Sequence, residues 1–161
     1  MGDRRAFFKA FAGLSVKKKE ERQHVYPPYF ENIDDFQNCL DCEGVCVDAC
    51  EEGIIEIIEK RPVLNFTTGG CTYCDECANI CPKDVLSLEY KKNIQAKIEI
   101  GIINCMAWNK TICRSCADVC LDNAIKFTGL FNPEIDYDEC TNCGFCVGVC
   151  PTQAITYGGV K

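Results

Sequence analysis

Short apolar runs recur along the chain, and four of them begin four residues after a cysteine. These four runs are Ile54–Ile58, Val85–Leu88, Ala124–Phe127 and Ala154–Tyr157. Two further runs stand shortly before a group of cysteines, at Val63–Phe66 and Ile135–Tyr137. Short runs rich in isoleucine and valine, bounded by polar turns, predict short β-strands.

A longer alternating pattern lies near the middle of the chain. Isoleucine or alanine stands at every second position from 94 to 102, with more polar residues between. A period of two predicts a half-buried strand, because successive side chains of a strand point to opposite faces. We expect this strand to pack one half of the chain against the other.

The segment before Val25 differs from the rest, because it carries seven basic residues against three acidic ones. Phe7, Phe8, Phe11 and Leu14 fall on one face of an amphipathic helix, although a frayed basic tail is an alternative. The start DRRAFFKAFAG is similar to a twin-arginine export motif. Since Lys9 interrupts the apolar run and KKKEER ends it, we expect the motif to stay uncleaved. The residues YPPY at 26–29 then predict an extended link.

Composition narrows the class of protein. Sixteen of the 161 residues are cysteine, and they fall in four tight groups of four. Regular quartets favour a metal framework in a reducing compartment over a set of disulfides. The net charge of −7 argues against a nucleic-acid partner, which needs a basic face. No apolar run approaches the length of roughly 18 residues that a membrane-spanning helix needs.

The spacing within the quartets points to iron–sulfur chemistry. CTNCGFCVGVCP, residues 140–151, has two, two and three residues between its cysteines and then a proline, which is the bacterial ferredoxin spacing. The quartet from Cys71 to Cys81 has the same spacing. The first quartet has three residues between Cys42 and Cys46, which leaves a three-iron cluster there as an alternative. Zinc is the other alternative, but its ligands usually come in two pairs across a longer spacer.

An internal repeat organises the quartets. The two regular quartets map onto each other at one constant offset, and Cys46 and Cys50 map onto Cys116 and Cys120 at an offset longer by one. A duplicated two-cluster module accounts for this pattern. The predicted fold is α+β: two tandem bacterial-type 2[4Fe–4S] ferredoxin-like modules, with short helices and two-stranded sheets around the clusters. The predicted divisions are residues 1–30 for the basic helix and link, 31–92 for the first module and 93–161 for the second.

In two-cluster ferredoxins the fourth cysteine of a quartet ligates the other cluster. Pairing neighbouring quartets therefore predicts four ligand sets, each for one [4Fe–4S] cluster. The first set is Cys39, Cys42, Cys46 and Cys81; the second is Cys71, Cys74, Cys77 and Cys50; the third is Cys105, Cys113, Cys116 and Cys150; the fourth is Cys140, Cys143, Cys146 and Cys120. The alternative is nested pairing, of the first quartet with the fourth and the second with the third. The spacers Cys50–Cys71 and Cys120–Cys140 are shorter than the spacer Cys81–Cys105, which favours sequential pairing.

Residues beside the cysteines have predicted supporting roles. Gly44, Gly144 and Gly148 would let the backbone approach sulfur closely. Trp108 would shield a cluster from water, and we expect Tyr73, Tyr137 and Phe145 to be core around the clusters. The sequence has no Ser–His–Asp set and no phosphate-binding loop, so it predicts an electron carrier or accessory protein, not an enzyme.

The sequence resembles the ferredoxin-type accessory proteins of periplasmic nitrate reductase. The features that carry the resemblance are the start RR-x-F-F, four quartets in a chain of this length, and the quartet Cys105–x7–Cys113–x2–Cys116–x3–Cys120. The resemblance implies a cytoplasmic protein with four [4Fe–4S] clusters. It also implies that the protein binds the precursor of the catalytic subunit of nitrate reductase ahead of its export, for assembly or redox loading of the precursor's own cluster. An electron-transfer subunit of another oxidoreductase and an inert structural or storage protein are the alternatives.

Overall fold

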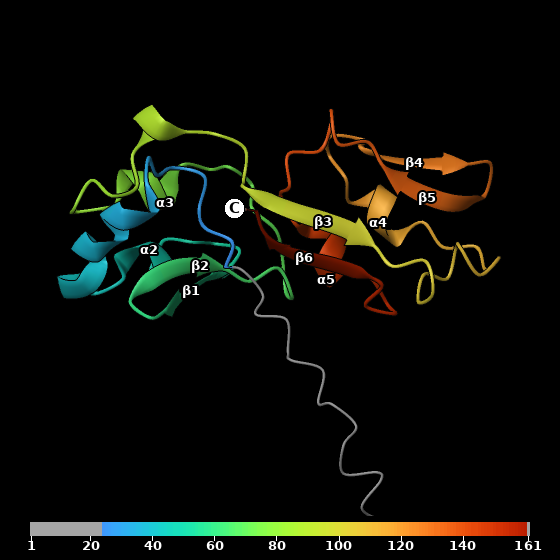
Figure 1. Ribbon diagram of the computed structural model, residues 1–161, viewed down its shortest axis with the longest axis horizontal. Coiled ribbons are helices and arrows are strands. Elements are labelled where there is room, and N and C mark those ends of the chain that lie inside the picture. Colours follow the sequence, from blue (N-terminus) through green and yellow to red (C-terminus); the bar gives the residue numbers. More distant parts are fainter. Residues whose placement is uncertain (1–23, 161) are drawn as a thin grey trace, which may run out of the picture.

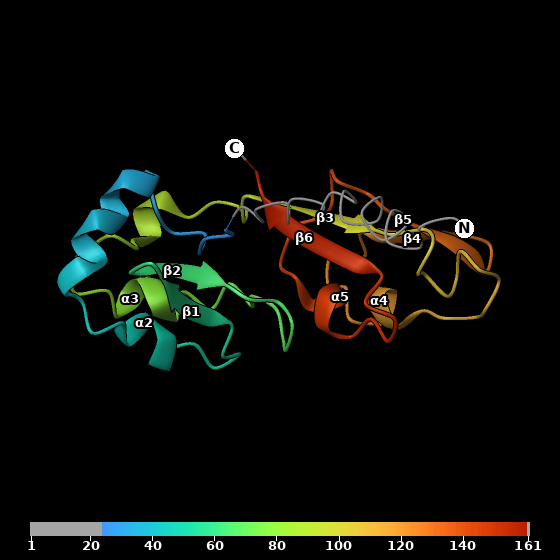
Figure 2. The same ribbon diagram turned by 60° about the horizontal axis from the view of Figure 1, so that its bottom comes forward.

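The computed structural model describes residues 24–160, so the predicted amphipathic helix lies outside the described part. Two lobes lie side by side along the long axis, the first holding β1 and β2 and the second holding β3 to β6 (Figures 1 and 2). No helix within the described residues is long and apolar enough to cross a bilayer. The helical elements are η1 (Ile33–Asp41), α2 (Val45–Asp48), α3 (Glu76–Asn79), η2 (Leu88–Tyr90), α4 (Ser115–Asp118) and α5 (Phe145–Gly148). The strands are β1 (Ile55–Ile58), β2 (Arg61–Leu64), β3 (Ala96–Ile100), β4 (Ile125–Thr128), β5 (Phe131–Ile135) and β6 (Ile155–Gly159).

Each lobe contains an antiparallel hairpin between its two quartets. β1 pairs with β2 around a two-residue loop, whose residues Glu59 and Lys60 both have positive φ, as a tight hairpin turn with right-handed strand twist requires. β4 pairs with β5 across a bulge at Phe127 and Thr128. Most of the predicted runs are therefore strands, although β5 begins well before the predicted run at 135–137 and ends at its first residue.

The alternating segment forms β3, which pairs antiparallel with β6 from Ala96↔Gly159 to Ile100↔Ile155. Ile94 and Ile98 are each 1% exposed, and Ile94 and Ala96 belong to the same buried cluster as the first-lobe core. The prediction that this segment packs one half against the other is thus confirmed for its first part. Ile102 lies beyond the strand and is exposed.

The predicted strand at Val85–Leu88 is wrong, because these residues form bends that lead into η2. In the internal repeat this segment corresponds to β6, and the segment around Tyr29 corresponds to β3. The two segments would therefore be expected to pair as β6 and β3 do. One bond of that ladder is present, from the Ser87 N–H to the Tyr29 carbonyl at 2.7 Å. Pro27 and Pro28 have no N–H to donate, so the rest of the ladder cannot form.

The residues predicted as a link are also part of the core. Val25, Tyr29 and Phe30 are 2%, 1% and 6% exposed and pack with Phe36 and Phe66. The Val25 carbonyl accepts a hydrogen bond from the Leu64 N–H at 2.7 Å. The first lobe therefore begins before residue 31.

Candidate metal centres

Four one-turn helices carry the third cysteine of each quartet. Cys46 lies in α2, Cys77 in α3, Cys116 in α4 and Cys146 in α5. Three of these helices follow a residue in the left-handed conformation, which turns the chain sharply out of the preceding cysteine loop. Each helix ends before the fourth cysteine, which continues away from the loop that holds the other three.

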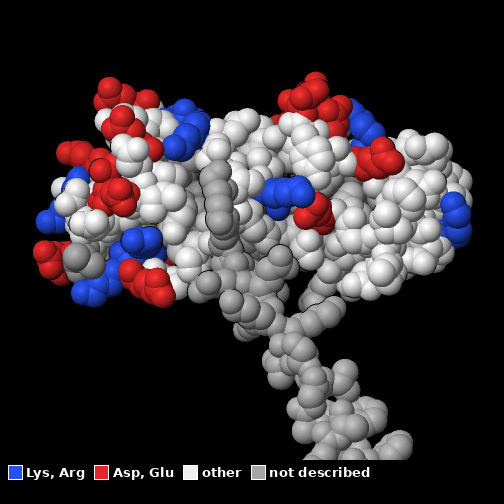
Figure 3. Space-filling model, viewed as in Figure 1, with Lys and Arg blue, Asp and Glu red and all other residues white. Residues whose placement is uncertain are grey.

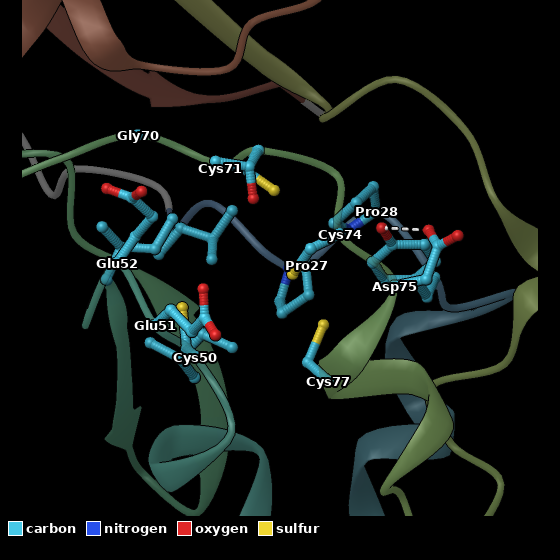
Figure 4. A pocket seen from close by; sticks show the side chains of 15 residues that line it. Pro27, Pro28, Cys50, Glu51, Glu52, Gly70, Cys71, Cys74, Asp75 and Cys77 are labelled. Atoms are coloured by element: carbon cyan, nitrogen blue, oxygen red, sulfur yellow. Dashed lines mark hydrogen bonds between the residues drawn. The ribbon is translucent and has the colours of Figure 1, made fainter.

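The second set surrounds a cavity in the first lobe. Cys50, Cys71, Cys74 and Cys77 line a space of about 430 Å³, together with Pro27 and Pro28 (Figure 4) and with Tyr29. Cys50 belongs to the first quartet and the other three to the second. The structure thus brings together the four cysteines that the sequence assigns to the second set.

The second lobe holds two such cavities. One of about 350 Å³ is lined by Cys105, Cys113, Cys116 and Cys150, with Met106, Ala107 and Pro151 beside them. The other, of about 340 Å³, is lined by Cys120, Cys140, Cys143 and Cys146. Each cavity has three cysteines from one quartet and the fourth cysteine of its neighbour.

The cysteines of the first set influence one another's pKa. Burial, and then the negative charge of a nearby Cys81 thiolate, raises the pKa of Cys39. Burial and the thiolate charges of Cys42 and Cys81 raise the pKa of Cys46 to about 11. Cys81 therefore lies within electrostatic reach of the first quartet, as the predicted first set requires.

The chemistry of these sites fits a bound iron–sulfur cluster. Burial raises the pKa of Cys77 and of Cys146 to about 12, and neighbouring thiolates add to the rise at both. Four thiolates at one cavity therefore need a compensating positive charge, which coordinated iron supplies. Within residues 24–160 no three Cys, His, Asp or Glu side chains converge tightly enough to hold a single metal ion. The sulfurs surround cavities instead, which suits a cube in which each thiolate binds a different iron.

Backbone N–H groups point at several of the sulfurs. Ala154 donates to Cys150 Sγ at 3.2 Å, Ala124 donates to Cys120 Sγ at 3.3 Å, and Leu86 donates to Cys81 Sγ at 3.5 Å. Although burial opposes it, the backbone donors led by Ala154 lower the pKa of Cys150. Such bonds stabilise negative charge on sulfur and tune the reduction potential of a bound cluster.

Several predicted supporting roles need correction. Trp108 does not line the cavity of the third set, where Met106 and Ala107 stand. Its indole N–H donates instead to the Pro133 carbonyl at 3.1 Å, over β5. Tyr137 is 58% exposed, so it is not core around a cluster, although its hydroxyl donates to the Ile98 carbonyl.

The predicted glycine role also differs at two positions. A Cβ on Gly144 would overlap the Phe66 ring, and a Cβ on Gly148 would lie 2.9 Å from the Thr67 carbonyl oxygen. The lack of a side chain at these two glycines therefore leaves room for Phe66 and Thr67 of the first lobe. Gly70 and Phe66, on the first-lobe side of this contact, were not predicted from the sequence. The pair Gly69–Gly70 directly before Cys71 was the sequence feature that could have indicated a close approach.

A polar network at the start of α3 was also not anticipated. Asp75 precedes the helix with φ of 70° and accepts hydrogen bonds from Lys91 Nζ at 2.6 Å and from the Tyr29 hydroxyl at 2.8 Å. The bond from Lys91, followed by that from Tyr29, lowers the pKa of Asp75. The network links the core residue Tyr29 to the loop of the second quartet.

Short helices and two-stranded sheets around quartets of cysteine define an α+β iron–sulfur protein of the ferredoxin type. Residues 38–85 match the family described as "4Fe-4S dicluster domain", and residues 133–156 match the "4Fe-4S binding domain" family. The chain is 31% identical over 149 residues to the ferredoxin-type protein NapF of Escherichia coli (strain K12), covering 89% of this chain and 90% of that protein. It is 32% identical over 168 residues to NapF of Haemophilus influenzae, covering 98% and 94%. The chain belongs to the NapF family of ferredoxin-type proteins.

A more distant relative is part of an ion-translocating oxidoreductase complex of Methanosarcina acetivorans. The chain is 34% identical over 127 residues to one protein of that complex, covering 70% of this chain but 44% of that protein. The family matches and these relatives show that the chain is a ferredoxin-type electron-transfer protein that binds [4Fe–4S] clusters. Such proteins carry electrons and are not enzymes.

Proposed function

We propose that the chain holds four [4Fe–4S] clusters in the four sequential ligand sets, and that it acts in maturation of the catalytic subunit of periplasmic nitrate reductase. Each bound cluster takes up and releases one electron at a time. The observation that carries the ligand assignment is that three cavities are each lined by three cysteines of one quartet and the fourth of its neighbour. The position of Cys81 near Cys39 and Cys46 supports the first set.

Paired cysteine substitutions test the third and fourth sets. We expect Cys150→Ala combined with Cys113→Ala to disturb a single cluster, because both thiolates belong to the third set. We expect Cys150→Ala combined with Cys143→Ala to disturb two clusters, because Cys143 belongs to the fourth. Iron and sulfide analysis with EPR counts the clusters left, starting from about sixteen irons in the anaerobically purified protein. If each quartet instead holds its own cluster, Cys150→Ala with Cys113→Ala disturbs two clusters. Cys150→Ala with Cys143→Ala then disturbs one. Nested pairing predicts two disturbed clusters in the first double variant.

The role in maturation rests on membership of the NapF family and on the resemblance to accessory proteins of periplasmic nitrate reductase. The proposed partner is the precursor of the catalytic subunit, met in the cytoplasm ahead of its export, whose own iron–sulfur cluster would be assembled or supplied with electrons. The second candidate is an electron-transfer component of another oxidoreductase, which the likeness to the ion-translocating complex favours. Loss of precursor activation without loss of turnover in the mature enzyme distinguishes the first role from the second.

Exposed apolar side chains near the third set offer a place for such a partner. Ile102, Ile103 and Ile112 flank Cys105 and Cys113 and are 57%, 89% and 69% exposed. In Figure 3 acidic and basic side chains are intermingled over the first lobe and at the upper edge of the second, while the far end of the second lobe is largely uncharged on this face. Exposed apolar groups beside a cofactor site are typical of protein-binding surfaces.

We expect Ile103→Asp to weaken binding to the precursor by tenfold or more, since a buried unpaired charge costs about 1.4 kcal/mol or more at an interface. Ile57→Asp is the matched control, because Ile57 is an exposed apolar residue of the first lobe. A pull-down titration with purified precursor measures both variants, and a parallel titration without residues 1–22 tests the basic segment. Equal binding by Ile103→Asp and Ile57→Asp would argue against this surface. No binding by the unaltered protein would argue against the maturation role.

A further inference from the structure

The two lobes meet where the second and fourth ligand sets stand. The backbone N–H of Cys71, from the second set, donates to the carbonyl of Cys143, from the fourth set, at 2.7 Å. If the second module were related to the first by simple translation along the molecule, the second set would instead face the third. The contact therefore orders the sets as first, second, fourth and third along the molecule.

Side chains from both loops bind the peptide groups of Ile94, in the segment that connects the lobes. The Tyr73 hydroxyl accepts a hydrogen bond from the Ile94 N–H at 3.1 Å and donates to the Thr141 carbonyl at 2.6 Å. The Asn142 amide donates to the Ile94 carbonyl at 3.0 Å. Tyr73 and Asn142 are equivalent in the internal repeat, so the two regular quartets hold the same connecting residue from two sides.

The backbone at these two positions has the same unusual conformation. Tyr73 has φ of 56° and Asn142 has φ of 59°. Asparagine tolerates the left-handed region, whereas a bulky residue such as tyrosine adopts it at a cost. Strain of this kind persists where the surrounding structure holds the residue firmly in place. At Tyr73 the hydroxyl is held by its bonds to the fourth-quartet loop and to the segment that connects the lobes.

Close apolar packing also holds the two lobes together at this contact. A Cβ on Gly70 would lie 2.5 Å from the Phe145 nitrogen, which shows how closely the two cysteine loops approach. The Phe66 ring is fully buried, with its centroid 5.0 Å from that of the Tyr157 ring of β6. The Tyr157 hydroxyl also accepts a hydrogen bond from the Phe66 N–H at 3.2 Å. The separation of the two loops is thus set by rigid packing as well as by hydrogen bonds.

We propose that Tyr73 is a positioning residue that fixes the second and fourth ligand sets against each other, so that clusters held there form the coupled pair between the two lobes. Its hydroxyl reaches from the second-quartet loop and bonds both to the fourth-quartet loop and to the segment connecting the lobes. The irregular first and third sets then lie at the ends of the series. This inference rests on the proposed ligand sets.

Tyr73→Phe tests the inference in the cluster-loaded protein. Tyr137→Phe is the matched control, because it removes a tyrosine hydroxyl whose bond, to the Ile98 carbonyl of β3, stays within one lobe. We expect Tyr73→Phe to keep the iron content of the unaltered protein. We expect it to exchange the Ile94 amide hydrogen about tenfold faster, because that donor loses its partner. We also expect weaker spin–spin broadening in the EPR spectrum of the fully reduced protein. Tyr137→Phe should change neither measurement.

The outcomes separate the inference from the ligand assignment. Unchanged exchange and an unchanged spectrum in iron-replete Tyr73→Phe overturn the positioning role while leaving the ligand sets intact. Faster exchange with an unchanged spectrum also overturns it, since the loops would then be held without setting the coupling. If Tyr73→Phe fails to load iron, Asn142→Gly keeps the positive φ but removes the amide bond to Ile94, and it should weaken the broadening to a smaller extent. An unchanged spectrum there overturns the role. Markedly fewer than about sixteen irons in the unaltered protein overturns the ligand sets instead.

Discussion

Removal of iron by an anaerobic chelator is expected to abolish cooperative unfolding of the protein. The cysteines surround spaces of about 430, 350 and 340 Å³ that bound clusters would fill. The buried thiols would be protonated at neutral pH, since the pKa of Cys77 and of Cys146 stands at about 12. Within residues 24–160 the sheets are two-stranded and the helices are short, and such elements are marginal in water on their own. Metal binding is then a large part of the folding free energy.

Thermal scans by circular dichroism, before and after chelation, measure this effect. We expect the sharp transition of the loaded protein to be replaced by a broad, non-cooperative change. Reconstitution with iron and sulfide is the control, and it should restore the transition together with the visible absorption of the clusters. An iron-free protein that keeps a sharp transition near the original midpoint would contradict the prediction.

Gly144→Ala is expected to be the most damaging single substitution outside the cysteines. The added methyl group would overlap the buried Phe66 ring, which cannot move without opening the contact between the lobes. Alanine would also be strained at the φ of 88° that precedes α5. Together these effects cost about 3 kcal/mol, of which about 1 kcal/mol is backbone strain. The midpoint of thermal unfolding should fall by about 9 °C.

Gly44→Ala is the matched control, because Gly44 also precedes a one-turn helix, α2 of the first lobe, with φ of 76°. Its added Cβ would meet Ile57 at 3.4 Å, an ordinary contact. This variant should show the backbone cost alone, a fall of about 3 °C. The difference between the two midpoints then measures the contact between the lobes. Equal midpoints would show that Phe66 does not hold the lobes together.

Local features of the fold were predictable because local residues determine them. Cysteine spacing predicted the loops that surround each cavity, and apolar runs predicted β1, β2, β4 and β6. The run at Val85–Leu88 misled, because its strand character depends on a partner far back in the chain, around Tyr29, where two prolines remove the donors. Trp108 and Tyr137 misled for a similar reason: neighbouring cysteines in the sequence do not decide which way a side chain packs.

The sequence by itself determined the chemistry of this protein. Four quartets of thiols at or near ferredoxin spacing specify iron–sulfur clusters, and the internal repeat indicates a duplicated pair. Only the tertiary structure decided which quartets meet across the lobes. That contact joins residues 68 and 91 positions apart, Tyr73 with Thr141 and Phe66 with Tyr157, and no short-range pattern encodes it. It depends on rings, glycines and peptide groups fitting together in space, which spacing along the chain cannot express.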